Sequence, residues 1–168
     1  KLISGQFVKR YKRFFVDVKI RGKTITAHCP NTGSMDGLLK KGNRVWLTKT
    51  NNLKRKLKYT LQIIQDKKSK VGVNTHLTNK IVLHALENNL IKEFNKEIKI
   101  KPETKYGSST RFDFLITKKN LKIFLEVKNV TLSRVNGLAE FPDAITSRGL
   151  KHINELINAG QEGYKIFI

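Results

Sequence analysis

The chain has 168 residues, of which 39% are hydrophobic and 28% are charged, a balance that suits a globular protein better than a disordered one. No stretch approaches the ~20 apolar residues that a membrane helix needs, so we expect a cytoplasmic protein. The single cysteine, Cys29, excludes an internal disulfide and a thiolate metal site. Adjacent strand residues point to opposite faces, so we expect Cys29 to be a small buried thiol and not a partner of His28.

The net charge of +21 is concentrated in the first part of the chain. Residues 1–70 carry 19 Lys and Arg but three Asp and Glu, whereas residues 71–168 carry 15 and 10. Each basic side chain that neutralises a phosphate releases a condensed counterion, so this excess favours a polyanionic partner. We predict DNA binding, with RNA as an open alternative. A membrane surface is disfavoured because no basic amphipathic helix with a bulky apolar face occupies this region.

In chain order, the first half is predicted to form short strands. The residues alternate from Phe14 to Ile20, which places Phe14 on the same face as Val16 and Val18. The expected strands are residues 14–20, 24–28, 45–48 and 59–64. Four or five short strands in residues 1–70 indicate a small OB-like, nucleic-acid-binding β-barrel. The polar residues 66–70 are the expected joint to the second domain.

The second half is predicted to be a mixed α/β domain over residues 71–168. A helix should begin with Thr78 or Asn79 as its N-cap. The other expected elements are an extended segment at 98–105, strands at 111–116 and 121–128, a helix at 144–158 that ends at Gly160, and a strand at 164–168. The last helix carries Leu150, Ile153 and Ile157 on its apolar face. A domain rarely finishes on a fresh apolar strand, so we expect the sequence to be truncated at its C-terminus.

Two carboxylates on neighbouring strands form the chemically most informative cluster. Asp113 and Glu126 flank the predicted hairpin turn, so antiparallel pairing can bring them side by side, with Lys128 on the strand face of Glu126. Buried carboxylates are costly unless something pairs with them, and Lys128 offsets only part of the charge. A hard cation, Mg²⁺ or Mn²⁺, would offset the rest, with Glu103 as a further ligand. A structural cross-strand ion pair is the alternative.

With a cation bound, this cluster would have the parts of a phosphodiesterase site. Asp113 and Glu126 would hold the metal, and the ammonium of Lys128 would favour hydroxide and stabilise charge on the phosphate. We therefore predict Asp113, Glu126 and Lys128 as catalytic residues, and Asp113, Glu126 and Glu103 as metal ligands.

Basic residues alternate with aromatic ones at residues 9–14 and 54–59. Cations suit phosphates, and aromatic rings can stack on the bases of a single strand. A solvated charged face with aromatic residues in the core is the alternative, and for Phe14 we expect the core. The predicted nucleic-acid-binding residues in these segments are Arg10, Arg13, Lys54, Arg55, Lys56 and Lys58. On the polar face of the last helix, Arg148 and His152 are expected to approach a phosphate near the metal, with a solvated face as the alternative. No helix-turn-helix or zinc-finger spacing is present.

Several segments resemble the sugar fermentation stimulation protein family of bacteria and archaea. They include RYKRFFVDV, TAHCPNTGSMDGL, EVKNVTL and FPDAITSRGLKHINEL, and the resemblance covers essentially the whole chain. It implies an α+β protein with an N-terminal OB-like barrel and a C-terminal domain resembling PD-(D/E)xK nucleases. It also implies DNA binding linked to regulation of sugar (maltose) metabolism genes. The nuclease-like motif falls on Asp113, Glu126 and Lys128, and Glu103 matches the family's acid before KYG.

Two functions follow from these observations. The first is a DNA-binding protein with a metal-binding, nuclease-like site, and the alternative is an active metal-dependent nuclease. The intact acid–acid–lysine set favours catalysis, because carboxylates that face phosphates do not help a pure binder. Against catalysis, a helix glutamate usual in the family is His84 here, which we expect to be a solvated helix residue. DNA binding is therefore the expected function.

Overall fold

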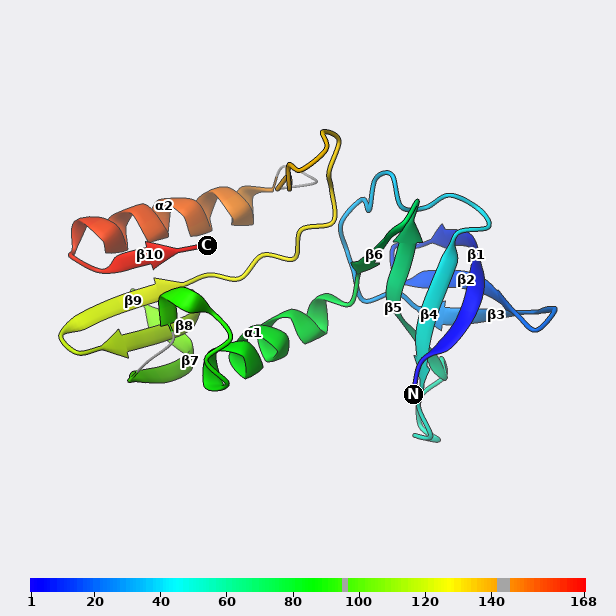
Figure 1. The fold of residues 1–168 in the computed structure, drawn as a ribbon, viewed down its shortest axis with the longest axis horizontal. Helices are drawn as coiled ribbons and strands as arrows, with labels where there is room; N and C mark the ends of the chain where they lie inside the picture. Colours follow the sequence, from blue (N-terminus) through cyan, green and yellow to red (C-terminus); the bar gives the residue numbers. More distant parts are fainter. Residues whose placement is uncertain (95–96, 142–145) are drawn as a thin grey trace. The chain divides into compact units, whose positions relative to one another are not determined.

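The structure is a computed structural model that describes residues 1–94, 97–141 and 146–168, apart from the side chain of Arg148. It divides into two compact units (Figure 1). The first comprises Lys1–His76 and Asn129–Ala144, and the second comprises Leu77–Lys128 and Ile145–Ile168. The first unit thus extends beyond the expected boundary at residue 70 and also takes in a later segment. No helix in the described ranges is long and apolar enough to cross a membrane.

The first unit contains a barrel of the OB type. Its strands are β1 (Ile3–Tyr11), β2 (Phe15–Ile20), β3 (Lys23–His28), β4 (Arg44–Lys49), β5 (Tyr59–Asp66) and β6 (Ser69–Gly72). They form one sheet in the order β3-β2-β1-β4-β5-β6. A parallel pairing of His28 with Thr60 joins β3 to β5 and closes a ring of five strands. The predicted OB-like barrel is therefore confirmed.

Two strands of this sheet were not expected from the sequence, and each has a local reason. In β1 the alternation is hidden by Gly5, where a Cβ would lie 2.6 Å from a methyl carbon of Val18, so the close neighbouring strand requires glycine. Asp66 and Ser69 are paired across a tight turn between β5 and β6. The polar residues at this point therefore form a hairpin and not a joint between domains.

The barrel core is formed by the inward side chains of its strands and of the segment between β3 and β4. Its buried members are Phe7, Val16, Val18, Ala27, Cys29, Met35, Leu38, Val45, Leu47, Leu61, Ile64 and Val73. Cys29 is a buried thiol, as expected, and burial raises its pKa. The expected place of Phe14 in the core is wrong. Phe14 precedes β2 in the β1–β2 turn and is 46% exposed, because Lys12 and Arg13 turn the chain with positive φ angles.

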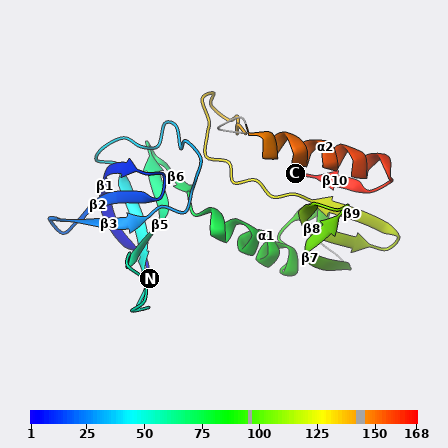
Figure 2. The same cartoon turned by 180° about the vertical axis from the view of Figure 1, so that it is seen from behind.

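The second unit is a four-stranded sheet with one α-helix on each face (Figures 1 and 2). Its elements are α1 (Thr78–Glu87), β7 (Ile98–Tyr106), β8 (Thr110–Lys118), β9 (Leu121–Leu125), α2 (Ser147–Gln161) and β10 (Lys165–Phe167), with a 3₁₀ turn at Lys92–Phe94. A second 3₁₀ turn, Thr75–Leu77, lies at the boundary between the two units. β7, β8 and β9 are antiparallel, and β10 runs parallel to β9. The α1 side buries Leu86 and Phe114, and the α2 side buries Phe112, Phe124 and Leu156.

Helix α2 packs with a different face from the one its apolar residues suggest. Leu156 and Ala159 are buried against the sheet, whereas Leu150, Ile153 and Ile157 are exposed. The helix begins after Thr146, whose hydroxyl accepts the N–H of Gly149, and continues through the expected stop at Gly160. Residues 144 and 145 of the predicted helix lie outside the described residues. The inward stripe places His152, one turn before Leu156, toward the end of β9.

Candidate functional site

Glu126 is the central residue of the candidate site in the second unit. It directly follows β9, and its backbone N–H donates to the carbonyl of Phe167 at 3.0 Å, which fixes its position beside β10. The side chain is only 4% exposed. Its Oε1 accepts from Nζ of Lys128 at 2.5 Å and lies 3.1 Å from Nδ1 of His152 on α2. Its Oε2 is buried and has no hydrogen-bond partner in the described part of the chain.

Asp113 lies next to Glu126 because β8 and β9 are paired up to Phe114 and Leu125. Its Oδ2 accepts the backbone N–H of Val127 at 2.7 Å, and its Oδ1 accepts from Nδ2 of Asn79 at 2.7 Å. Burial raises the pKa of Asp113, and the negative charge of Glu126 raises it further. The hydrogen bonds from Val127 and Asn79 and the charge of Lys128 act in the opposite direction.

The donor set of this cluster fits a hard divalent cation. An unpartnered buried carboxylate oxygen is costly, about 1–3 kcal/mol or more for a charged group. A cation bound by Glu126 and Asp113 would remove that cost. Across the described ranges, no three His, Cys, Asp or Glu side chains form a complete cage. The remaining ligands would have to be water or phosphate oxygens, which is the usual arrangement for Mg²⁺.

The structure does not bring the third predicted ligand into the cluster. Glu103 occupies the β7 position opposite Asp113, between the pairs formed by Pro102 with Phe114 and Thr104 with Phe112. Its side chain is 59% exposed, however, and its carboxylate lies 3.8 Å from Arg111. The left-handed backbone of Glu103, with φ of +49°, interrupts the regular strand at this point. Glu103 therefore pairs at the surface.

On α1, the residue that reaches the cluster is Asn79. Thr78 and Asn79 were expected to cap the helix, but the N-cap is Leu77 and makes no side-chain capping bond. His84 is exposed and contacts Asn88 at 3.2 Å, as expected for a solvated helix residue. Helical periodicity could have predicted this contact from the sequence. Asn79 lies three residues before Val82, on the helix face that packs on the sheet.

His152, predicted to approach a phosphate near the metal, lies within the cluster itself. It comes from α2 and contacts Glu126 with its side chain only 17% exposed. Arg148, predicted for the same role, has its side chain outside the described part of the chain. Of the predicted polar face of α2, His152 is the residue that contacts a carboxylate of the cluster in the described part of the chain.

In the barrel, Arg10 is held by backbone carbonyls. Its guanidinium donates to Asn31 at 2.7 Å, to Gly33 at 2.8 Å, to Ser34 at 3.2 Å and to Arg13 at 2.9 Å. These bonds occupy all three nitrogens and fasten the loop after β3 to the β1–β2 turn. The structure therefore gives Arg10 the role of a loop anchor, and a contact of its guanidinium with phosphate stays a prediction.

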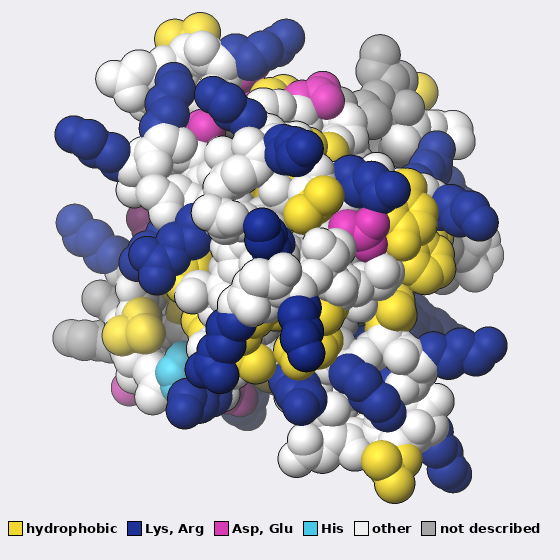
Figure 3. All heavy atoms as spheres, turned by 90° about the vertical axis from the view of Figure 1, so that its right-hand side faces the viewer, with side chains coloured by type: hydrophobic (Ala, Val, Ile, Leu, Met, Phe, Trp, Pro, Cys, Tyr) yellow, Lys and Arg dark blue, Asp and Glu magenta, His cyan; other side chains and the backbone are white. Residues whose placement is uncertain are grey.

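The other predicted basic residues lie in two loops of the barrel. Arg13 is exposed in the β1–β2 turn, and Lys54, Arg55 and Lys56 are exposed in the loop between β4 and β5. Lys58 closes that second loop by donating to the carbonyls of Asn52 and Leu53, at 3.0 and 3.2 Å. These are the loops that flank the ligand face of OB folds. On the face drawn in Figure 3, Lys and Arg side chains are widespread and acidic side chains are sparse.

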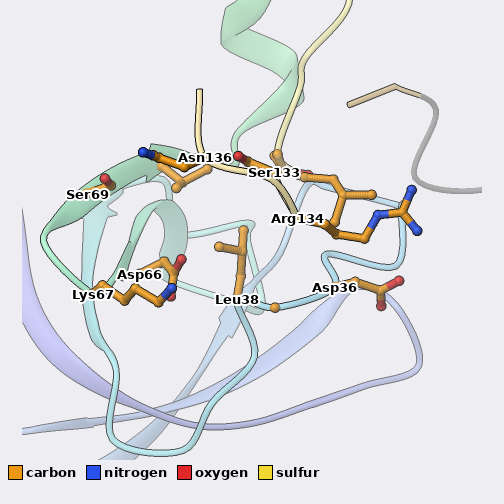
Figure 4. A pocket seen from close by; sticks show the side chains of 12 residues that line it. Asp36, Leu38, Asp66, Lys67, Ser69, Ser133, Arg134 and Asn136 are labelled. Atoms are coloured by element: carbon orange, nitrogen blue, oxygen red, sulfur yellow. The ribbon is translucent and has the colours of Figure 1, made fainter. Parts of the chain in front are cut away.

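A separate concavity of about 700 Å³ lies in the first unit (Figure 4). Its lining includes Asp36, Asp66, Lys67 and Arg134, so acidic and basic side chains are mixed. Arg134 is already paired with Glu140, at 2.7 Å. None of the predicted site residues lines this concavity, and its mixed charge offers no selective attraction for a polyanion.

Comparison with known proteins places the chain in a family. The model for the SfsA N-terminal OB domain matches residues 8–73, and the model for the sugar fermentation stimulation protein RE domain matches residues 76–168. The chain belongs to the sugar fermentation stimulation protein family. The homolog from Pelagibacter ubique is 58% identical over 99% of this chain and 72% of its own length. The homolog from Marinomonas sp. is 44% identical over 98% of this chain and 65% of its own.

A solved structure of the same family has the same fold. The structure of Pyrococcus furiosus SfsA in complex with Ca²⁺ matches with a TM-score of 0.85 and 29% identity. The match covers 99% of this chain and 70% of that one. The shared fold therefore includes both the barrel and the sheet unit.

The anchoring role of Arg10 can be tested by its removal. We expect Arg10→Ala to lower the free energy of unfolding by about 2 kcal/mol or more, because several carbonyls lose their donor. Arg10→Lys should recover little of this free energy, since an ammonium cannot replace the planar guanidinium. Urea denaturation measures the effect, with Arg13→Ala as the exposed neighbouring control. An unchanged urea midpoint together with weaker DNA binding in Arg10→Ala would contradict the anchor and support a phosphate contact.

Proposed function

We propose that this chain is a DNA-binding protein that also holds a divalent cation at a site like that of PD-(D/E)xK nucleases. The observation that carries DNA binding is the placement of exposed basic residues in the two loops beside the ligand face of an OB barrel. Arg13 belongs to the first loop, and Lys54, Arg55 and Lys56 belong to the second. The family resemblance adds a link to regulation of sugar (maltose) metabolism genes.

The DNA-binding proposal can be tested by salt dependence and paired substitutions. Duplex DNA affinity should fall as salt rises, because each phosphate contact releases a counterion. The double variant Arg55→Ala/Lys56→Ala should bind at least tenfold more weakly and reduce the logarithmic salt slope by about two. Lys119→Ala/Lys122→Ala is the charge-matched control, at the β8–β9 hairpin away from Asp113. Fluorescence anisotropy measures both effects, and an affinity independent of salt would contradict phosphate contacts.

The cation proposal is supported by the buried oxygen of Glu126 and by the Ca²⁺ complex of the Pyrococcus furiosus relative. Asp113 and Glu126 would hold the ion, with Mg²⁺ or Mn²⁺ as the expected metals. A bound cation supplies positive charge for a phosphate and lowers the pKa of a coordinated water. Lys128 and His152 orient Glu126, and Asn79 orients Asp113 through their hydrogen bonds.

Metal binding should be visible as stabilisation of the fold. We expect Ca²⁺, Mg²⁺ or Mn²⁺ to raise the Tm of the wild-type chain, since a ligand at about 100 times its Kd adds about 2.7 kcal/mol. Glu126→Gln should abolish the increase, because it removes the charge of the central ligand. Glu87→Gln, in an exposed position of α1, is the matched control and should retain the increase. An equal increase of Tm in Glu126→Gln would place the ion elsewhere.

A second function, metal-dependent hydrolysis of nucleic acid, is favoured by one specific contact. Nζ of Lys128 lies 2.5 Å from Glu126, and Glu126 lies beside Asp113, so the acid–acid–lysine set is assembled in space. A pure binder would lose affinity from carboxylates facing phosphates. In such an enzyme, Lys128 would stabilise charge on the phosphate during cleavage.

Hydrolysis can be distinguished from binding by a cleavage assay. The chain is incubated with single- and double-stranded DNA and RNA, in Mg²⁺, in Mn²⁺ and in chelator. If it is a nuclease, cleavage should require metal and fall at least a hundredfold in Lys128→Ala, the size of effect expected for a removed charge-stabilising donor. Lys119→Ala should cleave normally. If no substrate is cleaved while binding persists, the chain is a binder alone.

A further inference from the structure

A row of side chains crosses the outer face of the barrel. The strand register pairs Tyr11 with Phe15, Phe15 with His28, and His28 with Thr60, so one row passes over β1, β2, β3 and β5. Side chains alternate along each strand, and the neighbours Val16 and Ala27 are buried in the core. The row therefore lies on the outside. Four adjacent strands span about 14 Å at the usual interstrand spacing.

One end of this row is aromatic. The rings of Tyr11 and Phe15 are stacked, with centroids 5.5 Å apart and an angle of 13° between their planes. Tyr11 is 37% exposed and Phe14, in the adjoining turn, is 46% exposed. The carbonyl of Phe14 accepts the N–H of Cys29 at 2.8 Å, which holds the turn against the end of β3. Exposed rings held in fixed positions are suited to stack on nucleobases.

The other end of the row is cationic. The imidazole rings of His28 and His76 lie 6.2 Å apart, and Arg55 donates to the hydroxyl of Thr60 at 3.2 Å. Burial lowers the pKa of His28, and the positive charges of Arg55 and His76 lower it further. Arg55, His28 and His76 thus lie close together at this end of the row, where a phosphate can accept hydrogen bonds from the guanidinium and the imidazole rings.

Asp17, an acidic side chain on the same face of β2 as Phe15, is already paired with other side chains. Asp17 accepts from the hydroxyls of Thr26 at 2.8 Å and Tyr11 at 3.3 Å, and it lies 3.8 Å from Nζ of Lys9. Its carboxylate is therefore held by three partners from β1 and β3. The row combines aromatic rings and positive charge, which is the pattern that binds the bases and phosphates of a nucleic acid.

We propose that this row binds single-stranded DNA, with bases stacked on Phe14 and on the Tyr11–Phe15 pair and a phosphate at Arg55, His28 and His76. The inference rests on the DNA binding proposed above and adds the form of the DNA. In a duplex the base faces are covered by their neighbours, so exposed aromatic rings would contribute nothing. The described part of the first unit also contains no α-helix to enter a major groove.

The inference is tested on the full chain with three fluorescent ligands of equal length: single-stranded oligothymidine, an abasic strand and a duplex. Wild type should bind oligothymidine more tightly than either of the others at equal salt. Phe14→Ala should weaken oligothymidine binding roughly 5- to 100-fold, while binding of the abasic strand changes little. Phe14→Tyr should retain wild-type affinity because it keeps the ring. Leu121→Ala, at an equally exposed position (46%), is the control for loss of apolar surface.

The phosphate position is tested by pH. A phosphate at His28 favours its protonated form, and the pKa of His28 is lowered from 6.5, so oligothymidine affinity should rise as the pH falls from about 7 to about 5. This rise should be smaller in His28→Gln, and an identical pH dependence in both proteins would overturn the phosphate position. Circular dichroism confirms that each variant is folded.

The outcomes separate the two proposals. Tighter binding of duplex than of oligothymidine, or full affinity in Phe14→Ala, would overturn the single-strand inference and leave DNA binding intact. Absence of binding to all three ligands at low salt would overturn both.

Discussion

A single strand pairing assembles the nucleic-acid face that we propose for the first unit. His28 at the end of β3 pairs with Thr60 at the start of β5, and this contact closes the barrel. It brings the β1–β2 turn, the end of β3 and the β4–β5 loop to one region, although they are far apart in the sequence. The exposed aromatic residue Phe14 and the basic residue Arg55 share a surface only because of this closure. Arg10 then holds the adjoining loop in place.

In the second unit, the corresponding constraint is the buried carboxylate of Glu126. A buried charge is tolerated when other groups offset it. Here one carboxylate oxygen is contacted by Lys128, from the segment after β9, and by His152, from α2. Among the described residues the second oxygen has no such partner, and Asp113 adds another negative charge. The positive charge of the chain is concentrated in the barrel, whereas the chemistry is concentrated in the sheet. The proposed DNA binding and the proposed cation site therefore involve different units and can be tested by different substitutions.

The strands in which apolar and polar side chains alternate without interruption could be predicted from the sequence. β2 follows its apolar alternation, with Val16 and Val18 buried, and β8 and β9 form the expected antiparallel hairpin. The predicted second strand, 121–128, is too long, because β9 ends at Leu125, and Glu126 and Lys128 follow it. β1 could not be predicted, because glycine at position 5 removes the apolar side chain from the pattern, and the reason for that glycine is the close approach of β2. The exposure of Phe14 depends on where the turn begins, which alternation alone does not specify.

The sequence is sufficient for the charge asymmetry, the two-part organisation and the identity of the acid–acid–lysine cluster. Charge is additive along a chain, and strand periodicity and hairpin length are local properties. The sequence is not sufficient to predict the orientation of α2. Its more apolar face is exposed, and the stripe of Leu156 and His152 faces the sheet. That choice depends on packing against Phe112 and Phe124, residues distant in the sequence. Long-range packing likewise directs Asn79 to Asp113 and Glu103 to the surface, since local patterns do not encode which elements meet.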